Sequence, residues 1–102
     1  MRLGPEDDGA ALTARVGETI TVRLPENPTT GFQWRPDLDT DSIQITNDRY
    51  QGPDRPRGAT GVHLFELLPT RPGVTRLRLV KERKWEGKPT DEFAVTLDVQ
   101  PA

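Results

Sequence analysis

The chain has 102 residues, a formal net charge of −2 and a hydrophobic content of 32%, which leaves room for one modest core in a single domain. The acidic balance gives no reason to expect a nucleic-acid partner, and no run approaches the roughly 18 apolar residues of a membrane-spanning helix. Cysteine is absent, which excludes a disulfide framework, a thiolate nucleophile and a cysteine metal site.

The first nine residues precede the first strand-like run, so we expect a flexible tail ahead of one domain spanning residues 10–102. The opening residues also lack the apolar core of a signal peptide. The sequence leaves the compartment undetermined: we expect a cytoplasmic protein as written, or an extracytoplasmic one if a leader has been removed.

Seven strand-like runs follow in chain order, at residues 11–15, 19–24, 32–35, 42–50, 62–68, 74–83 and 92–100. The last has the cleanest period, because its large apolar side chains stand at every second position from 93 to 99. No stretch of comparable length has helical spacing. Ten prolines and nine glycines, spread along the chain, are typical of short elements joined by turns. The pattern predicts an all-β fold, an immunoglobulin-like antiparallel β-sandwich of about seven strands.

The connections between these strands divide into two groups. If consecutive strands run antiparallel, their connections alternate between the two ends of the sandwich, so residues 25–31, 51–61 and 84–91 share one end. We call these connections the first, second and third loops. They are the richest in glycine, proline and exposed functional groups, which predicts that this end binds a partner.

Nucleophilic catalysis is not favoured. His63 is the only histidine and Ser42 the only serine, and they lie on different predicted strands with no nucleophile motif around either. We interpret His63 as a strand residue whose ring has hydrogen-bond partners, and the chain as a protein that is not an enzyme.

Metal binding is not favoured either. Asp37, Asp39 and Asp41 have the opening spacing of a calcium loop, but Ser42 stands where that loop has glycine, and Asp48 where it has glutamate. We interpret the segment as a solvated acidic turn with no metal. The glycines at positions 58 and 61 have no following lysine and no strand-to-helix context, so no phosphate site or cofactor is expected.

The first loop and its continuation read Asn27-Pro28-Thr29-Thr30-Gly31-Phe32. Pro28 fixes its own φ and pushes Asn27 towards an extended backbone, while Gly31 can adopt angles closed to other residues. A loop this stiff has little conformational entropy to lose on docking. Its pair of hydroxyls therefore suggests a surface presented to a partner, against the alternative of an ordinary tight turn.

The two tryptophans have different surroundings in the sequence. Trp34 lies in the short third strand and is expected between the sheets. Trp85 stands among charged residues and glycine, so we expect an exposed indole at the tip of the third loop, where aromatic side chains anchor interfaces. The alternative is that Trp85 folds back over the edge of the sandwich.

Read together, Asn27-Pro28-Thr29-Thr30-Gly31-Phe32, Gly58-Ala59-Thr60-Gly61 and Arg83-Lys84-Trp85 resemble the three loops of the chagasin-type inhibitors of cysteine peptidases. The first matches the family signature NPTTG[YF] without a change. The other two stand where the family has G-x-G-G and R-P-W. Thr60 thus replaces a glycine, which restricts how extended the second loop can lie, and Lys84 replaces a proline, which makes the third loop less rigid. The resemblance covers nearly the whole chain.

The resemblance implies a reversible, non-covalent inhibitor of papain-like cysteine peptidases, with three loops entering the active-site cleft. Thr29 and Thr30 would lie over the catalytic cysteine and histidine, the second loop along the non-primed side, and the third loop on the primed side. The implied contact residues are Asn27, Pro28, Thr29, Thr30, Gly31, Phe32, Gly58, Ala59, Thr60, Gly61, Arg83, Lys84 and Trp85.

A generic immunoglobulin-like adhesion or ligand-binding module, without inhibitory activity, could use the same three loops. The co-occurrence of all three motifs at one expected end favours the inhibitor, because a generic module has no reason to show it. We expect a monomer with no nucleic-acid or membrane partner.

Overall fold

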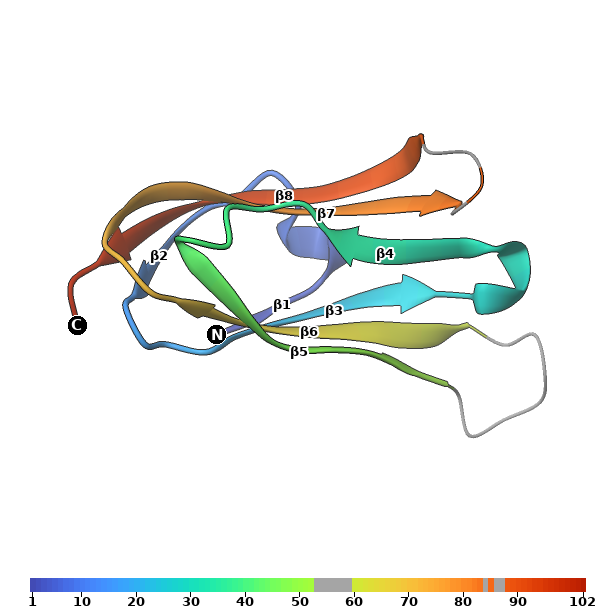
Figure 1. Cartoon of the computed structure of the whole chain (residues 1–102), viewed down its shortest axis with the longest axis horizontal. Coiled ribbons are helices and arrows are strands. Elements are labelled where there is room, and N and C mark those ends of the chain that lie inside the picture. The colour runs from blue at the N-terminus through green and yellow to red at the C-terminus, as the bar shows by residue number, and fades with distance from the viewer. Residues whose placement is uncertain (53–59, 84, 86–87) are drawn as a thin grey trace.

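The computed structural model describes residues 1–52, 60–83, 85 and 88–102, which form two β-sheets packed face to face (Figure 1). One sheet has the strand order β1-β3-β6-β5 and the other β2-β8-β7-β4. The strands are β1 (Arg2–Leu3), β2 (Ala11–Arg15), β3 (Ile20–Glu26), β4 (Phe32–Pro36), β5 (Ile43–Gln51), β6 (Gly61–Pro69), β7 (Gly73–Arg83) and β8 (Pro89–Gln100). Two 3-10 turns, η1 (Pro5–Asp7) and η2 (Pro28–Thr30), are the helical elements of the described residues, and neither could cross a membrane.

The all-β sandwich expected from the sequence is confirmed, with eight strands in place of about seven. Each expected strand is present, and the largest difference in bounds is at β8, which begins at Pro89 rather than Glu92. Four strand pairs are antiparallel, but β1–β3 and β2–β8 are parallel. No hairpin joins the partners in either parallel pair, so turn geometry does not impose the antiparallel direction on them.

The first nine residues differ from the expected flexible tail, because they are hydrogen-bonded along the sandwich. The terminal amine of Met1 donates to the carbonyl of Thr19 at 3.1 Å, and Leu3 is buried. Further along, the Gly9 N–H donates to the Ala94 carbonyl at 2.7 Å. A two-residue strand is too short to show an alternating pattern, which is why the sequence did not reveal β1.

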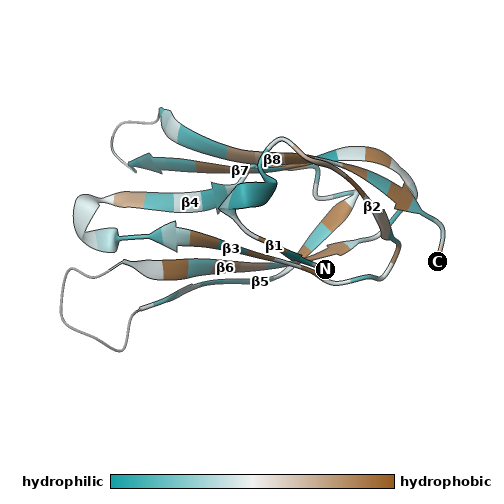
Figure 2. Cartoon of the chain, turned by 180° about the vertical axis from the view of Figure 1, so that it is seen from behind, coloured by the Kyte–Doolittle hydropathy of each residue, from teal (hydrophilic) through white to brown (hydrophobic). Residues whose placement is uncertain are grey.

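The core lies between the two sheets and follows the alternation of the strands. Figure 2 shows hydrophobic positions along β6, β7 and β8, the strands at or next to the centre of each sheet. Trp34 is also buried, as expected, so β4 contributes its indole to the interior. The largest fully buried side chains are Phe65, Phe93, Ile20, Leu24, Ile43, Leu67, Leu77, Leu79 and Leu97.

The acidic turn before β5 is held by its own side chains. Asp39 accepts hydrogen bonds from the Ser42 hydroxyl at 2.9 Å and from the Asp41 N–H at 3.0 Å. Both hydrogen bonds, chiefly the one from the Ser42 hydroxyl, hold the pKa of the Asp39 carboxyl below its usual value. The segment therefore acts as a hydrogen-bonded turn into β5.

The basic residues of β7 are matched by carboxylates on neighbouring elements. Arg76 and Arg78 both bond to Glu92 on β8, at 3.0 Å and 2.7 Å, and Arg78 also pairs with Asp37. This part of the sheet thus presents alternating charge rather than a continuous basic patch.

Candidate functional site

The six strand ends that flank the first, second and third loops lie at one end of the sandwich, at the right of Figure 1. The register brings them together: Glu26 pairs with Gly61, and Gln51 with Val62, in one sheet. In the other sheet Phe32 pairs with Arg83, and Glu82 with Pro89. The bases of the first, second and third loops therefore lie at the same end, as strand parity predicted. Of the candidate contact residues, Gly58, Ala59 and Lys84 lie outside the described residues.

The first loop is shaped by its own side chains. Asn27 has φ −121° and ψ 100°, the extended backbone expected before a proline, and its side-chain oxygen accepts a hydrogen bond from the Thr29 N–H at 3.1 Å. Pro28–Thr30 then forms one 3-10 turn. Gly31 ends it with φ 82°, a left-handed conformation that glycine adopts without strain.

Both threonine hydroxyls of this loop donate inside it. The Thr29 hydroxyl lies 2.6 Å from the side-chain oxygen of Asn27, and the Thr30 hydroxyl lies 2.7 Å from the Asn27 carbonyl oxygen. Both residues are exposed. Each hydroxyl has one proton and two lone pairs, so the oxygens keep acceptor capacity after the protons are used. The Thr30 oxygen also accepts a hydrogen bond from the Phe32 N–H at 3.4 Å. The loop is therefore braced internally, and its exposed hydroxyl oxygens retain some acceptor capacity.

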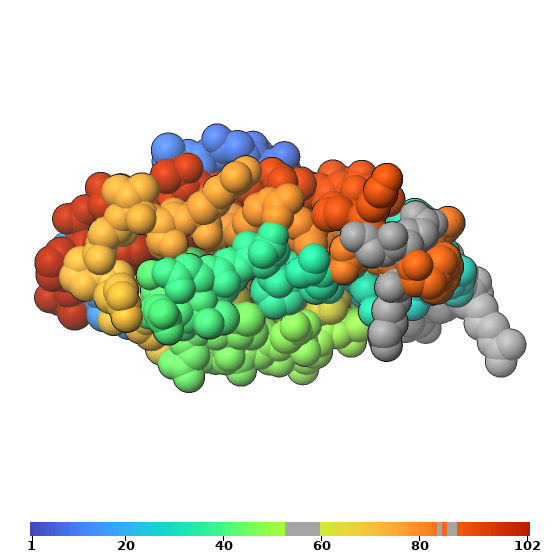
Figure 3. Space-filling view, turned by 45° about the horizontal axis from the view of Figure 1, so that its top comes forward, coloured from blue at the N-terminus to red at the C-terminus, as the bar shows by residue number. Residues whose placement is uncertain are grey.

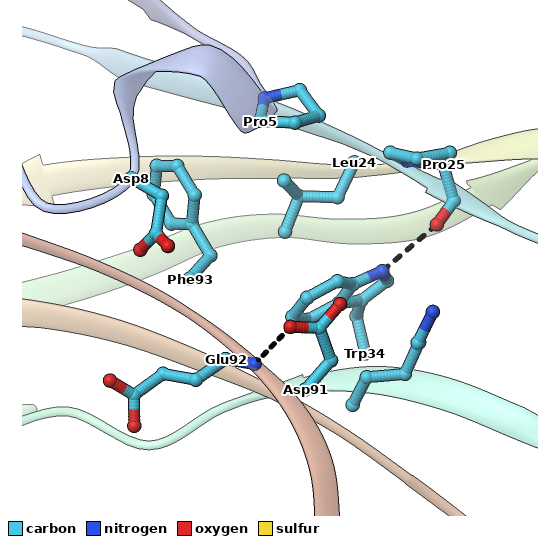
Figure 4. Close-up of a pocket in the computed structure, with 9 residues that line it drawn as sticks. Pro5, Asp8, Leu24, Pro25, Trp34, Asp91, Glu92 and Phe93 are labelled. Atoms are coloured by element: carbon cyan, nitrogen blue, oxygen red, sulfur yellow. Dashed lines mark hydrogen bonds between the residues drawn. The ribbon is translucent and has the colours of Figure 1, made fainter.

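A buried carboxylate supports the first loop from below. Glu26, immediately before Asn27, is 3% exposed. Its Oε1 accepts a hydrogen bond from the Trp34 N–H at 2.6 Å and lies 3.1 Å from Nδ1 of His63. Figure 4 shows a second tie, in which the Trp34 indole N–H donates to the Pro25 carbonyl at 2.9 Å. The two strands that carry the first loop are thus joined directly beneath it, although they belong to different sheets.

His63 lies between two carboxylates. Its Nδ1 faces Glu26, and its Nε2 lies 2.5 Å from the Asp48 carboxylate. The ring also stacks on Phe65, with centroids 4.3 Å apart. The expected strand histidine with a satisfied ring is confirmed, and Ser42 bonds elsewhere, to Asp39.

Sequence reasoning overlooked Glu26, although its signal was present. In β3 the inward positions are Ile20, Val22 and Leu24, and the next position in that alternation is Glu26. A carboxylate at an inward strand position requires buried hydrogen-bond partners. The alternation could therefore have marked it as a structural anchor of the loop.

The third loop meets the first through Trp85 and Arg83. Trp85 is 72% exposed, as expected for a loop tip, yet its ring edge reaches Gly31: a Cβ on that glycine would lie 2.4 Å from Cη2 of the indole. The Arg83 guanidinium lies 4.2 Å from the centroid of the Phe32 ring, and its Nε donates to the Thr30 carbonyl at 3.3 Å. In Figure 3 the orange surface at the end of β7 adjoins cyan surface of the first loop.

Of the second loop, the structure describes Gln51, Gly52, Thr60 and Gly61, and Thr60 is exposed. Gly61 is buried against Tyr50, because a Cβ there would lie 2.4 Å from the Tyr50 hydroxyl and from the Gln51 carbonyl oxygen. A hollow lined by Pro25, Thr30, Phe32 and Thr60 separates this strand start from the first loop. The second loop therefore ends at a closely packed position beside the first loop, where the chain enters β6.

Two other features limit the kinds of site that this end of the sandwich can form. Among the residues that the structure describes, no group of histidine and carboxylate side chains has an arrangement suited to a metal ion. A pocket of about 150 Å³ lies on the flank of the sandwich, between the η1 turn and Trp34 (Figure 4). It lies against the base of the first loop and not at the exposed tip. The exposed groups that the structure describes at the loop tips include the hydroxyls of Thr29 and Thr30 and the indole of Trp85.

Comparison with known proteins gives one consistent result. The family model described as chagasin family peptidase inhibitor I42 matches residues 13–97. Chagasin of Trypanosoma cruzi is 32% identical over 96 residues, covering 88% of this chain and 87% of chagasin. A crystal structure of the cysteine protease inhibitor EhICP2 from Entamoeba histolytica superposes with a TM-score of 0.88 at 24% identity, over 97% of this chain and 94% of that one. PbICP-C, solved in complex with falcipain-2, has a TM-score of 0.67 at 15% identity, over 98% and 90% of the two chains.

Proposed function

The chain belongs to the chagasin family of peptidase inhibitors, and from this premise we propose that it inhibits papain-like cysteine peptidases by placing the three-loop end in their active-site cleft. The observation that carries the proposal is the internally braced first loop beside the exposed Trp85. The protein acts as an inhibitor and not as an enzyme. The proposed contact residues are those of the three loop motifs, residues 27–32, 58–61 and 83–85.

The braced first loop favours tight binding for an entropic reason. A loop that is already ordered loses little conformational freedom when it docks, so more of the contact energy appears as affinity. Two side chain–backbone bonds, one side chain–side chain bond and a proline fix its shape. A modest surface can then block a cleft effectively.

The same geometry favours non-covalent inhibition without cleavage. Peptidases bind substrates as extended strands, whereas Pro28–Thr30 forms a 3-10 turn that ends in a left-handed glycine. Such a backbone does not present an extended peptide bond for attack. The inhibitor also has no cysteine with which to form a disulfide to the peptidase.

The acceptor character of the loop suits the proposed target. Cysteine peptidases pair a thiolate with a protonated histidine, which is a hydrogen-bond donor. The oxygens of Thr29 and Thr30 retain lone pairs after their protons are used inside the loop. A surface of acceptors is therefore complementary to the donors of such a site.

Titration of papain or a cathepsin L-like peptidase with the purified, folded protein tests the proposal directly. We expect stoichiometric loss of activity that returns on dilution, with the inhibitor chain intact by mass spectrometry. Trypsin serves as the control, because a serine peptidase offers no thiolate–imidazolium pair. Absence of inhibition at micromolar concentration, with folding shown by circular dichroism, would leave an immunoglobulin-like binding module without inhibitory activity.

Replacing Trp85 by alanine is expected to weaken inhibition by about 1–2 kcal/mol, roughly 5–30-fold, because an exposed indole at the rim of a loop cluster is a typical interface anchor. Since Trp85 is 72% exposed, the urea midpoint should change little. Inhibition constants and urea unfolding curves, measured on the same preparations, check both parts. An equal loss of affinity and stability would instead mean that the indole acts mainly within the fold.

A further inference from the structure

The outer face of the β1-β3-β6-β5 sheet carries apolar side chains where polar ones are expected. In β6, Phe65 and Leu67 belong to the core between the sheets, so the alternate positions of this strand face outwards. Those positions hold Val62, Leu64, Glu66 and Leu68. An antiparallel sheet with one solvated face normally alternates between hydrophobic residues inside and polar residues outside. Strand β6 is instead largely apolar on both faces, which is typical of a strand that is covered on both sides.

Two arginines border the centre of this outer face. Leu64 is 4% exposed, yet it is not part of the core cluster between the sheets. The register places Arg23 of β3 opposite Leu64 on one side and Arg49 of β5 opposite it on the other, and both arginines are exposed. Among the residues that the structure describes, neither arginine has a carboxylate within 4 Å, Glu66 included. We call Arg23, Leu64 and Arg49 the arginine–leucine row.

The other sheet has an equivalent row with a different charge balance. There the fully buried Val80, which is also outside the core cluster, lies between Arg35 of β4 and Glu92 of β8. Its two flanking side chains have opposite charges, so that row is balanced within itself. The arginine–leucine row has two cations and no anion. Arginine covers apolar surface with its aliphatic stem and keeps its guanidinium in water, so both charged groups remain available to a partner.

From this arrangement we propose that the arginine–leucine row, with Val62 beside it, is a second docking surface, and that its occupant is an acidic, partly apolar peptide segment of another protein. This surface goes beyond the proposed function, because it lies on the side of the sandwich and the three loops lie at its end. Charge complementarity calls for carboxylates in the partner, and the outward apolar positions of β6 call for an apolar side chain.

The spacing of the row defines the segment that fits it. Neighbouring strands lie about 4.8 Å apart, so the backbones of Arg23 and Arg49 are about 10 Å apart. An extended peptide advances about 3.3 Å per residue, so two carboxylates three positions apart span the same distance. Each carboxylate can accept two parallel hydrogen bonds from one guanidinium, while an apolar side chain between them contacts Val62. A sulfated polysaccharide offers anions without that apolar side chain, which is why the surface favours a peptide.

Fluorescence anisotropy with a labelled octapeptide tests the proposal. The probe carries two glutamates three positions apart with a leucine between them, and a second probe has glutamines in place of the glutamates. We expect saturable binding of the acidic probe to the folded protein and none of the glutamine probe. Arg23→Gln/Arg49→Gln should raise the dissociation constant at least about tenfold, because two charge-assisted contacts are lost. Absence of binding to the wild type would overturn the proposal.

Arg35→Gln/Arg76→Gln is the matched control. It removes the same two charges from the outer face of the other sheet, where these arginines pair with Glu82 and Glu92. We expect an unchanged dissociation constant, and a loss equal to that of Arg23→Gln/Arg49→Gln would attribute binding to net charge and overturn the proposal. Because all four arginine side chains lie on outer faces, both variants should keep the wild-type circular dichroism spectrum and urea midpoint.

Two further measurements distinguish the peptide from other occupants. Sedimentation equilibrium of the protein alone should show a monomer, and a dimer that the Arg23→Gln/Arg49→Gln variant lacks would overturn the proposal by making a second copy the occupant. A heparin octasaccharide should displace the probe much less effectively than the unlabelled peptide does. Equal displacement would identify a general anion patch and would also overturn the proposal. Neither measurement involves a peptidase, so the outcome does not depend on the proposed function.

Discussion

Replacing Glu26 by alanine is expected to lower the free energy of unfolding by about 3–5 kcal/mol, a large share of the stability of a small domain. The carboxylate is 3% exposed and receives the Trp34 N–H at 2.6 Å, with Nδ1 of His63 at 3.1 Å. Its removal leaves two buried polar groups without this partner, and an unpaired buried group costs more than its hydrogen bond contributed.

Urea unfolding at neutral pH measures this effect, with Glu82→Ala as the control. Glu82 pairs with Arg35 instead. The Glu82 side chain is 17% exposed and that of Arg35 is 50% exposed, so water reaches this pair, and we expect it to contribute about 1 kcal/mol or less. Glu26→Gln should lie between the two, because its carbonyl oxygen can still receive the Trp34 N–H. Equal losses for Glu26→Ala and Glu82→Ala would show that the buried network does not support the sandwich.

The strands could be predicted from the sequence because their alternating pattern is a local property. The grouping of the loops could be predicted because it depends only on the order and direction of the strands. Alternation in β8 reflects one buried face, and strand parity needs no knowledge of side-chain contacts. The stiffness of the first loop likewise follows from Pro28 and Gly31, whose backbone limits are intrinsic.

The contacts that shape the site could not be predicted in the same way. Trp85 and Gly31 are far apart in the chain, and nothing local to either indicates that the indole occupies the space above the glycine. The hydroxyls of Thr29 and Thr30 were expected to point outwards, but the direction of their protons depends on Asn27 in its folded position. Glu26 is an intermediate case: its inward position follows from the strand alternation, but its partners come from two other strands, β4 and β6.

Replacing Gly31 by alanine is expected to weaken inhibition about a hundredfold or more, beyond the loss from Trp85→Ala. Two effects act together. An alanine at φ 82° is strained, and its Cβ would lie 2.4 Å from Cη2 of Trp85, so the indole must move or the turn must change. The variant therefore loses the placement of both loops at once.

Gly17 provides the matched control for this change. It has φ 87°, lies in the turn between β2 and β3 at the opposite end, and has no heavy atom within 4 Å of the position that a Cβ would take. Both alanine variants should lose about 1–2 kcal/mol of stability from backbone strain, measured by urea unfolding. Only Gly31→Ala should lose inhibition as well. If the two variants inhibit equally well, the contact between Gly31 and Trp85 does not shape the binding surface, and the first loop acts independently of the third.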